Sequence, residues 1–179
     1  MYLIKVPFSR VKNLVKMQNG EVSRSSFYFF RTMTFTILSY SQYIALEKLE
    51  SIYKSCDLVS NLCVHVPPGA ASPIAVLFPH EVNLRYALSL STDPALAHIQ
   101  NADLALLCAH PYVKHLVLKD CNEIGAKNGL KGAEVLVGVI MTPEEWTPET
   151  GLVTAAQKIQ RITVALAFQK EIAVRSAGK

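Results

Sequence analysis

Two polar strings near opposite ends of the sequence contain the side chains that could take part in chemistry. The first, RVKNLVKMQNGE at 10–21, combines basic residues with an Asn-Gly pair, and the second, EWTPETGLVTAAQKIQR at 145–161, contains Lys158. A lysine ammonium is a compact positive charge that can stabilise negative charge where two anionic groups meet. Small alanines precede Lys158 and suit insertion of its loop into another cavity. The alternative is a solvated surface lysine, the commoner role of an isolated lysine between a loop and a helix.

The histidines and cysteines lack the spacing of a metal site. His110 and His115 are five residues apart rather than four, and no histidine has metal-ligand spacing with a cysteine. The four cysteines contain no C-x-x-C pair, so reduced thiols are expected. No metal site is predicted, and no local signature suggests a Ser-His-Asp or Cys-His arrangement. Trp146, the single tryptophan, is expected to be a packing residue.

The composition predicts a globular chain with a hydrophobic core. Half of the 179 residues are hydrophobic and 18% are charged, which favours a buried core over disorder. The net charge of +4 is spread along the chain, so nucleic-acid binding is not predicted; only the basic N-terminus keeps it as a weak alternative. The most apolar window, 33–40, is far shorter than the roughly 20 residues of a membrane-spanning helix. We expect no membrane span, no signal peptide and a cytoplasmic location.

Helices and strands are predicted to alternate in the first half of the orderly region. Residues 45–55 place apolar side chains at helical spacing and predict an amphipathic helix. The β-prone runs 62–66 and 74–78 flank a Pro/Gly/Ser cluster and predict an antiparallel pair of strands. The segment 80–91 is typical of a helix, and Asp93-Pro94 predicts the start of another short one.

The second half continues this alternation. Pro111 begins the longest predicted helix, which ends near Asn128-Gly129. The apolar run 134–142 predicts a strand covered on both faces, and a loop then leads to a last helix over 160–174. The predicted fold class is α+β: a small domain whose sheet of about three strands is flanked by helices, with an N-terminal hairpin.

The first polar string and YIALEKLESIYKS at 43–55 together resemble the hinge motif of acyl-CoA synthetases in the adenylate-forming, or AMP-binding, superfamily. The match is to the fungal type of long-chain fatty-acid CoA ligase. The string at 145–161 resembles the same family's C-terminal lysine motif, with Lys158 at the position of the catalytic lysine. Intervening segments such as SCDLVSNLCVHV also resemble the family, so the resemblance covers nearly all of 43–161. The chain is therefore identified as similar to the C-terminal cap domain of such a ligase.

The resemblance implies ATP-dependent activation of long-chain fatty acids, through an acyl-adenylate to acyl-CoA. The parent enzyme would use ATP, Mg²⁺ and CoA. Lys158 would assist adenylation, and Arg10 would contact the adenylate near the hinge. Four residues would belong to a loop that lines the CoA tunnel after a domain rotation: Lys16, Asn19, Gly20 and Glu21. Arg10 and Lys16 could equally be exposed strand residues of a basic hairpin, and Asn19-Gly20 is also an ordinary hairpin turn signal.

The same resemblance implies parts of the enzyme that are not found in this sequence. The phosphate loop, adenine pocket and ribose-binding aspartate belong to the family's N-terminal AMP-binding domain, and Ser9 stands where the hinge motif has aspartate. We expect the isolated chain to be inactive and the parent's N-terminal domain to be its partner, with long-chain fatty acid and CoA as substrates. The parent could work peripherally at endoplasmic reticulum, peroxisome or lipid-droplet membranes. The alternative is a non-catalytic interaction module that docks on a partner enzyme.

Residues 22–42 are expected to be an insertion foreign to the family, between a hinge or hairpin remnant at 1–21 and the cap domain at 43–179. Their removal joins Asn-Gly-Glu to YIALEKLE and restores the family sequence. Val22-Ser23 can be read as a 5′ splice site and Gln42 as a 3′ splice site, so we hypothesise a translated intron. Sequencing of the mature transcript tests this hypothesis. The alternative is a genuine hairpin extension, in which FYFF pairs with FTIL.

Overall fold

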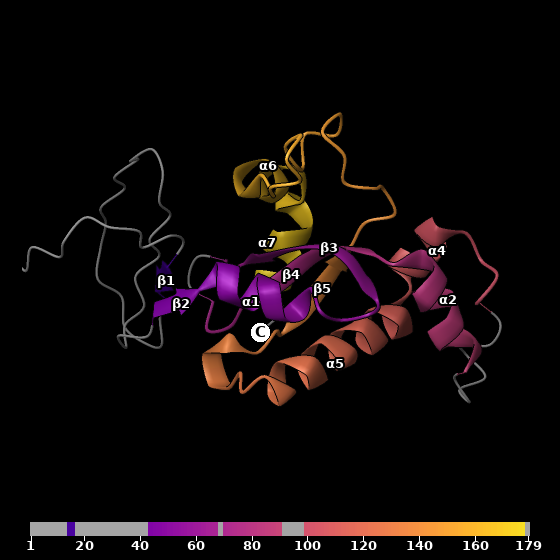
Figure 1. The fold of residues 1–179 in the computed structure, drawn as a ribbon, viewed down its shortest axis with the longest axis horizontal. Coiled ribbons are helices and arrows are strands. Elements are labelled where there is room, and N and C mark those ends of the chain that lie inside the picture. Colours follow the sequence, from indigo (N-terminus) through magenta and orange to yellow (C-terminus); the bar gives the residue numbers. More distant parts are fainter. Residues whose placement is uncertain (1–13, 17–42, 68–69, 91–98, 178–179) are drawn as a thin grey trace, which may run out of the picture.

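The computed structural model describes residues 14–16, 43–67, 70–90 and 99–177. The described elements form a three-stranded mixed sheet with helices on both faces, and a separate two-stranded hairpin (Figure 1). The helix predicted to start at Asp93-Pro94 and the insertion proposed for 22–42 lie outside the described residues. In the described part of the chain, no helix combines the length and apolar composition needed to cross a membrane.

The sheet has the strand order β3-β4-β5. Strands β3 (Val59–His65) and β4 (Ile74–Pro79) are antiparallel, which confirms the predicted pair. Strand β5 (Gly138–Met141) runs parallel to β4, so the sheet is mixed. A parallel neighbour needs a long crossover connection, and the helices between β4 and β5 provide it. β5 is shorter than the predicted strand at 134–142, because Glu134 belongs to a short 3₁₀ helix, η1 (Gly132–Glu134), and the backbone of Leu136 is hydrogen-bonded to the Asn122 side chain instead of to β4.

Four helices belong to the side of the sheet that holds the larger apolar cluster: α1 (Leu46–Tyr53), α2 (Glu81–Ser89), α4 (Leu104–Ala109) and α5 (Pro111–Lys127). The predicted helices at 45–55, 80–91 and 111–128 are confirmed, whereas α4 was not predicted. Strand residues alternate between the two faces, and those that belong to this cluster are Val59, Leu62, Val64, Ala75, Leu77, Val139 and Met141.

Helix α5 packs closely on α1 because its Gly125 lies against Tyr53 of α1. A Cβ atom added to Gly125 would lie 3.0 Å from Cε1 of the buried Tyr53, so only glycine fits without displacing this ring. The Tyr53 hydroxyl donates a hydrogen bond to the Glu134 carbonyl over 2.9 Å. Asn122 exchanges two hydrogen bonds with the backbone of Leu136. The Tyr53 hydrogen bond holds α1, and the Asn122 hydrogen bonds hold α5, to the segment that leads into β5.

The opposite face of the sheet carries α6 (Arg161–Ala167) and α7 (Gln169–Ala177), which Figure 1 shows across the sheet from α5. The prediction of one helix over 160–174 is wrong, because Phe168 leaves helical geometry with φ −107° and ψ 22°. Val164 before the break, Phe168 at the break and Ile172 after it all contact the same apolar cluster. Trp146 is 2% exposed in this cluster, which confirms its predicted packing role.

The N-terminal hairpin pairs β1 (Leu14–Lys16) with β2 (Tyr43–Ala45) in antiparallel register, with Lys16 opposite Tyr43. In the described residues, the predicted remnant at 1–21 supplies one strand of this pair, and the other comes from beyond the proposed insertion. Without residues 22–42, five residues would link Lys16 to Tyr43, a usual hairpin loop length. Strand β2 continues directly into α1.

Candidate functional site at the Lys158 hairpin

A small hairpin between β5 and α6 presents Lys158. Its base is an antiparallel bridge between Val153 and Ile159, and the Gln160 N–H donates a hydrogen bond to the Leu152 carbonyl over 2.8 Å. Leu152 and Val153 are 5% and 1% exposed and belong to the smaller apolar cluster. The base of the hairpin is therefore fixed to the sheet by burial of apolar surface.

The tip of the hairpin is a tight turn that holds the backbone of Lys158. The Gln157 N–H donates to the Thr154 carbonyl over 2.8 Å, and Gln157 has a φ of +56°. This is the three-residue hairpin loop in which a turn is followed by a left-handed residue. The Thr154 N–H donates to the Lys158 carbonyl over 2.8 Å, and the Lys158 N–H donates to Thr154 Oγ1 over 3.2 Å. Both backbone polar groups of Lys158 are thus engaged.

The side chain of Lys158, by contrast, is exposed to solvent. The ion pairs found among the described residues do not include Lys158. Its ammonium is therefore available to an anionic ligand that approaches from outside the domain. A fixed backbone with an accessible charge is the arrangement expected of a group that enters a neighbouring cavity.

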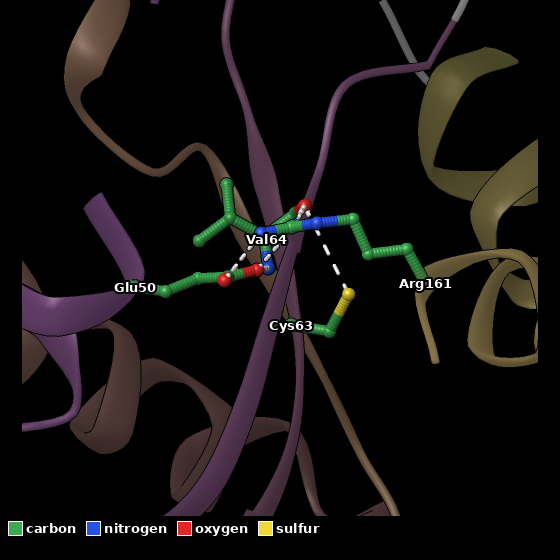
Figure 2. A network of polar contacts seen from close by, with 4 residues as sticks. All are labelled: Glu50, Cys63, Val64 and Arg161. Carbon is green, nitrogen blue, oxygen red and sulfur yellow. Dashed lines mark hydrogen bonds and ion pairs between the residues drawn. The ribbon is translucent and has the colours of Figure 1, made fainter. Parts of the chain in front are cut away.

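Directly after the hairpin, Arg161 forms an ion pair with Glu50 of α1 (Figure 2). The Arg161 Nη1 and Nη2 atoms each donate to a different carboxylate oxygen of Glu50, both over 2.5 Å. Val64 of β3 joins the network: its N–H donates to Glu50 Oε1 over 2.8 Å, and its carbonyl accepts from Arg161 Nη1 over 3.3 Å. The Glu50 and Arg161 side chains are only 11% and 24% exposed, so water screens this contact weakly.

This network changes the proton affinity of its neighbours. Burial raises the pKa of the Glu50 carboxyl, and the Arg161 guanidinium opposes the shift. Burial, followed by the Arg161 charge, lowers the pKa of His65, which favours the neutral imidazole. Burial raises the pKa of the Cys63 thiol to about 12. Cys63 is therefore a neutral packing residue and not a thiolate nucleophile.

The other predicted site residues are not described. Arg10, Asn19, Gly20 and Glu21 lie outside the described residues, and for Lys16 only the backbone in β1 is described. Their predicted roles therefore stay predictions. Within the described ranges, no group of three or more His, Cys, Asp or Glu side chains could hold a metal ion.

The Glu50–Arg161 pair is the feature of the site that the sequence-based prediction missed. A signal for half of it was present, because Glu50 lies four residues after Leu46 and three before Tyr53, on the apolar face of α1. A carboxylate on the buried face of a helix needs a hydrogen-bonded partner. The identity of that partner, 111 residues away, is not visible in the sequence.

Comparison with known proteins shows what this chain is similar to. No protein-family model matches the chain. Long-chain-fatty-acid–CoA ligase 1 of Schizosaccharomyces pombe is 39% identical over 163 residues, which cover 91% of this chain and 20% of the ligase. Long-chain-fatty-acid–CoA ligase 4 of Saccharomyces cerevisiae is 34% identical over the same shares. The chain thus spans about one fifth of the length of these curated relatives.

Solved structures support the same fold. The A domain of carboxylic acid reductase from Segniliparus rugosus, in complex with AMP and a co-purified carboxylic acid, superposes with a TM-score of 0.59 at 24% identity. This match covers 78% of the chain and 19% of that structure. An adenylation domain of a carboxylate reductase from Mycobacterium chelonae gives a TM-score of 0.57 at 20% identity. The sequence matches thus show that this chain is similar to the C-terminal part of the long-chain-fatty-acid–CoA ligases, and the solved structures show that it shares the fold found in adenylation domains.

Proposed function

We propose that this chain acts as the C-terminal domain of a long-chain-fatty-acid–CoA ligase and supplies Lys158 to the adenylation step. In that step a fatty-acid carboxylate oxygen attacks the α-phosphate of ATP, pyrophosphate leaves, and an acyl-adenylate forms. The CoA thiol then attacks the acyl carbon and releases AMP. Two anionic groups meet in the first step, so a cation placed between them stabilises the transition state.

The observation that supports this proposal is the geometry of Lys158. Its backbone N–H and carbonyl are both hydrogen-bonded to Thr154, and its side chain is exposed at a turn. A lysine in such a turn can enter a nucleotide site on another domain without unfolding its own. The sequence matches to ligases include the region that contains this hairpin.

The remaining components would belong to the rest of the ligase. About four fifths of each matched relative lies outside the match, and we propose that this part holds ATP, Mg²⁺ and the fatty acid. Arg10 would contact the adenylate near the hinge. The loop with Lys16, Asn19, Gly20 and Glu21 would line the path of CoA during thioester formation. Peripheral association of the parent with organelle membranes also stays a prediction.

The proposal predicts no turnover by the chain alone. Purified chain incubated with ATP, Mg²⁺, palmitate and CoA should release no AMP above background. Robust AMP release would contradict the assignment of the ATP site to another part of the ligase.

A fused enzyme tests the role of Lys158 directly. The C-terminal region of the S. pombe ligase would be replaced by this complete chain, and palmitate-dependent exchange between ATP and pyrophosphate would be measured. Lys158→Ala should lower the exchange rate by about 10²- to 10³-fold, as expected for loss of one charge-stabilising donor.

The matched control is Lys170→Ala, which removes another exposed lysine on the same side of the sheet. Both variants should unfold within about 0.5 kcal/mol of the parent protein, because both side chains are exposed. An equal loss of exchange in the two variants, or an inactive parent fusion, would count against the proposed function.

A further inference from the structure

At Val64, the edge of β3 that faces away from β4 contacts two side chains and, in the part of the chain that the structure describes, no other strand. In the described residues β3 pairs with β4 alone, yet the Val64 N–H and carbonyl are both hydrogen-bonded, to Glu50 and Arg161. In an antiparallel strand the N–H and carbonyl of one residue point to the same side. Both groups of Val64 therefore face the free edge, where the ion pair takes the place of a neighbouring strand.

The ion pair also joins the two helical layers of the domain. Glu50 comes from α1, whose buried residues belong to the larger cluster, and Arg161 begins α6, which packs on the opposite face. Figure 2 shows the two side chains approaching Val64 from opposite sides of the strand. Because two nitrogens bind two oxygens, the contact restricts orientation as well as distance.

The position of Arg161 in the chain connects this contact to Lys158. Only Ile159 and Gln160 separate the two residues. The other anchors of the hairpin, Leu152, Val153 and Ile159, are apolar, and apolar burial is not directional. The Glu50–Arg161 contact lies next to the hairpin and consists of two parallel hydrogen bonds, which fix an orientation. It can therefore set the direction in which the turn projects.

We propose that Glu50 and Arg161 are positioning residues that orient the Lys158 hairpin toward the adenylation site. This inference rests on the proposed function. Neither residue touches substrate; each acts through the backbone that leads to Lys158. Displacement of a reacting group by about 1 Å can lower a rate on the order of 100-fold, so the orientation of the hairpin affects the rate of adenylation.

Arg85 offers a matched control for a purely structural role. Its side chain also binds a glutamate, Glu81, and donates to the carbonyls of Gln100 and Ala102 over 2.7 and 2.8 Å. These contacts join α2 to the segment before α4 and do not involve the hairpin. Substitution of Arg85 therefore removes a comparable network without changing the support of Lys158.

Amide hydrogen exchange on the complete 179-residue chain is the first test. Arg161→Lys keeps the charge but loses the planar fork. Exchange of the hydrogen-bonded amides of Thr154, Gln157 and Gln160 should speed up at least about tenfold, while the amides of α5 stay protected. Arg85→Lys should leave the hairpin amides unchanged. Uniform acceleration along the chain in Arg161→Lys would overturn the positioning role.

The fused ligase provides the second test, with Glu50→Gln as a second variant in case Arg161→Lys folds poorly. Both variants should lower kcat for the adenylation half-reaction at least about tenfold, with the KM values for ATP and palmitate changed less than about twofold. Thioester formation from supplied acyl-adenylate and CoA should stay within about twofold of the parent.

The outcomes separate this inference from the proposed function. Equal losses in both half-reactions, or losses matched by Arg85→Lys, would show a structural role and overturn the inference. Unchanged adenylation in both variants while Lys158→Ala abolishes it would overturn the inference alone. Unchanged adenylation in Lys158→Ala would overturn the proposed function, and the positioning role with it.

Discussion

The two faces of the sheet differ in how much apolar surface they bury and in what they present to solvent. Among the described residues, the cluster that includes α1, α2, α4 and α5 contains 22 buried residues, and the cluster under α6 and α7 contains 9. The exposed Lys158 hairpin projects from the smaller cluster. Most of the hydrophobic stabilisation therefore comes from one face, and the other face can support a turn that enters another domain.

The largest expected change in stability comes from two substitutions in one strand, which compare the two clusters directly. Leu77 and Val76 are neighbours on β4, both 0% exposed, and point into the larger and the smaller cluster respectively. Leu77→Ala should lower the free energy of unfolding by about 3 kcal/mol, and Val76→Ala by about 2 kcal/mol. Urea denaturation monitored by circular dichroism measures both values.

Hydrogen exchange sharpens the same comparison. Val76→Ala should accelerate exchange mainly in α6 and the hairpin, because these segments pack on the smaller cluster. A larger loss of stability in Val76→Ala than in Leu77→Ala would show that the smaller cluster dominates the stability of the domain.

A smaller effect is expected at the turn itself. Gln157 has a φ of +56°, which disfavours a residue with a side chain, whereas Ala156 is not in the left-handed region. Gln157→Gly should raise the free energy of unfolding by about 0.5 to 1 kcal/mol, and Ala156→Gly should lower it, because glycine there only adds freedom to the unfolded chain. Equal destabilisation by both substitutions would rule out strain at Gln157.

The smallest effect concerns pH. Because the pKa of His65 in the folded state is lowered below its ordinary value of 6.5, the unfolded chain binds a proton at a higher pH than the folded chain does. The contribution of His65 to stability is thus present above pH 6.5 and is lost as the pH falls through the folded-state pKa. Urea unfolding between pH 5 and 7.5 should show a shallower pH dependence in His65→Gln than in the parent chain.

Direct titration of His65 by NMR provides an independent check. Arg161→Lys, which keeps a positive charge, should leave the His65 pKa lowered, whereas the neutral Arg161→Met should move it upward, since the guanidinium charge contributes to the shift. A His65 pKa that does not respond to either substitution would leave burial as the sole cause.

Local patterns in the sequence predicted the elements whose structure depends on nearby residues. The amphipathic stripe over 45–55 and the Pro111 start with its Asn128-Gly129 stop are set within a few turns of one helix, and α1 and α5 follow them closely. The turn cluster between the two β-prone runs likewise predicted the antiparallel pair of β3 and β4. The periodic spacing of apolar residues in a helix or strand depends on residues that are close in the sequence. Such elements can therefore be predicted without knowledge of the tertiary structure.

The resemblance to acyl-CoA ligases could also be found from the sequence alone, because each motif is a run of consecutive residues. Only the tertiary structure showed where β5 begins, that the last helix breaks at Phe168 and which residue neutralises Glu50. Each of these depends on a partner far away in the sequence: a neighbouring strand, a shared apolar cluster, or an arginine 111 residues later. Such contacts exist only after the chain has folded, because the free energy that selects them comes from strand pairing, apolar burial and ion pairing between distant residues and not from local conformation.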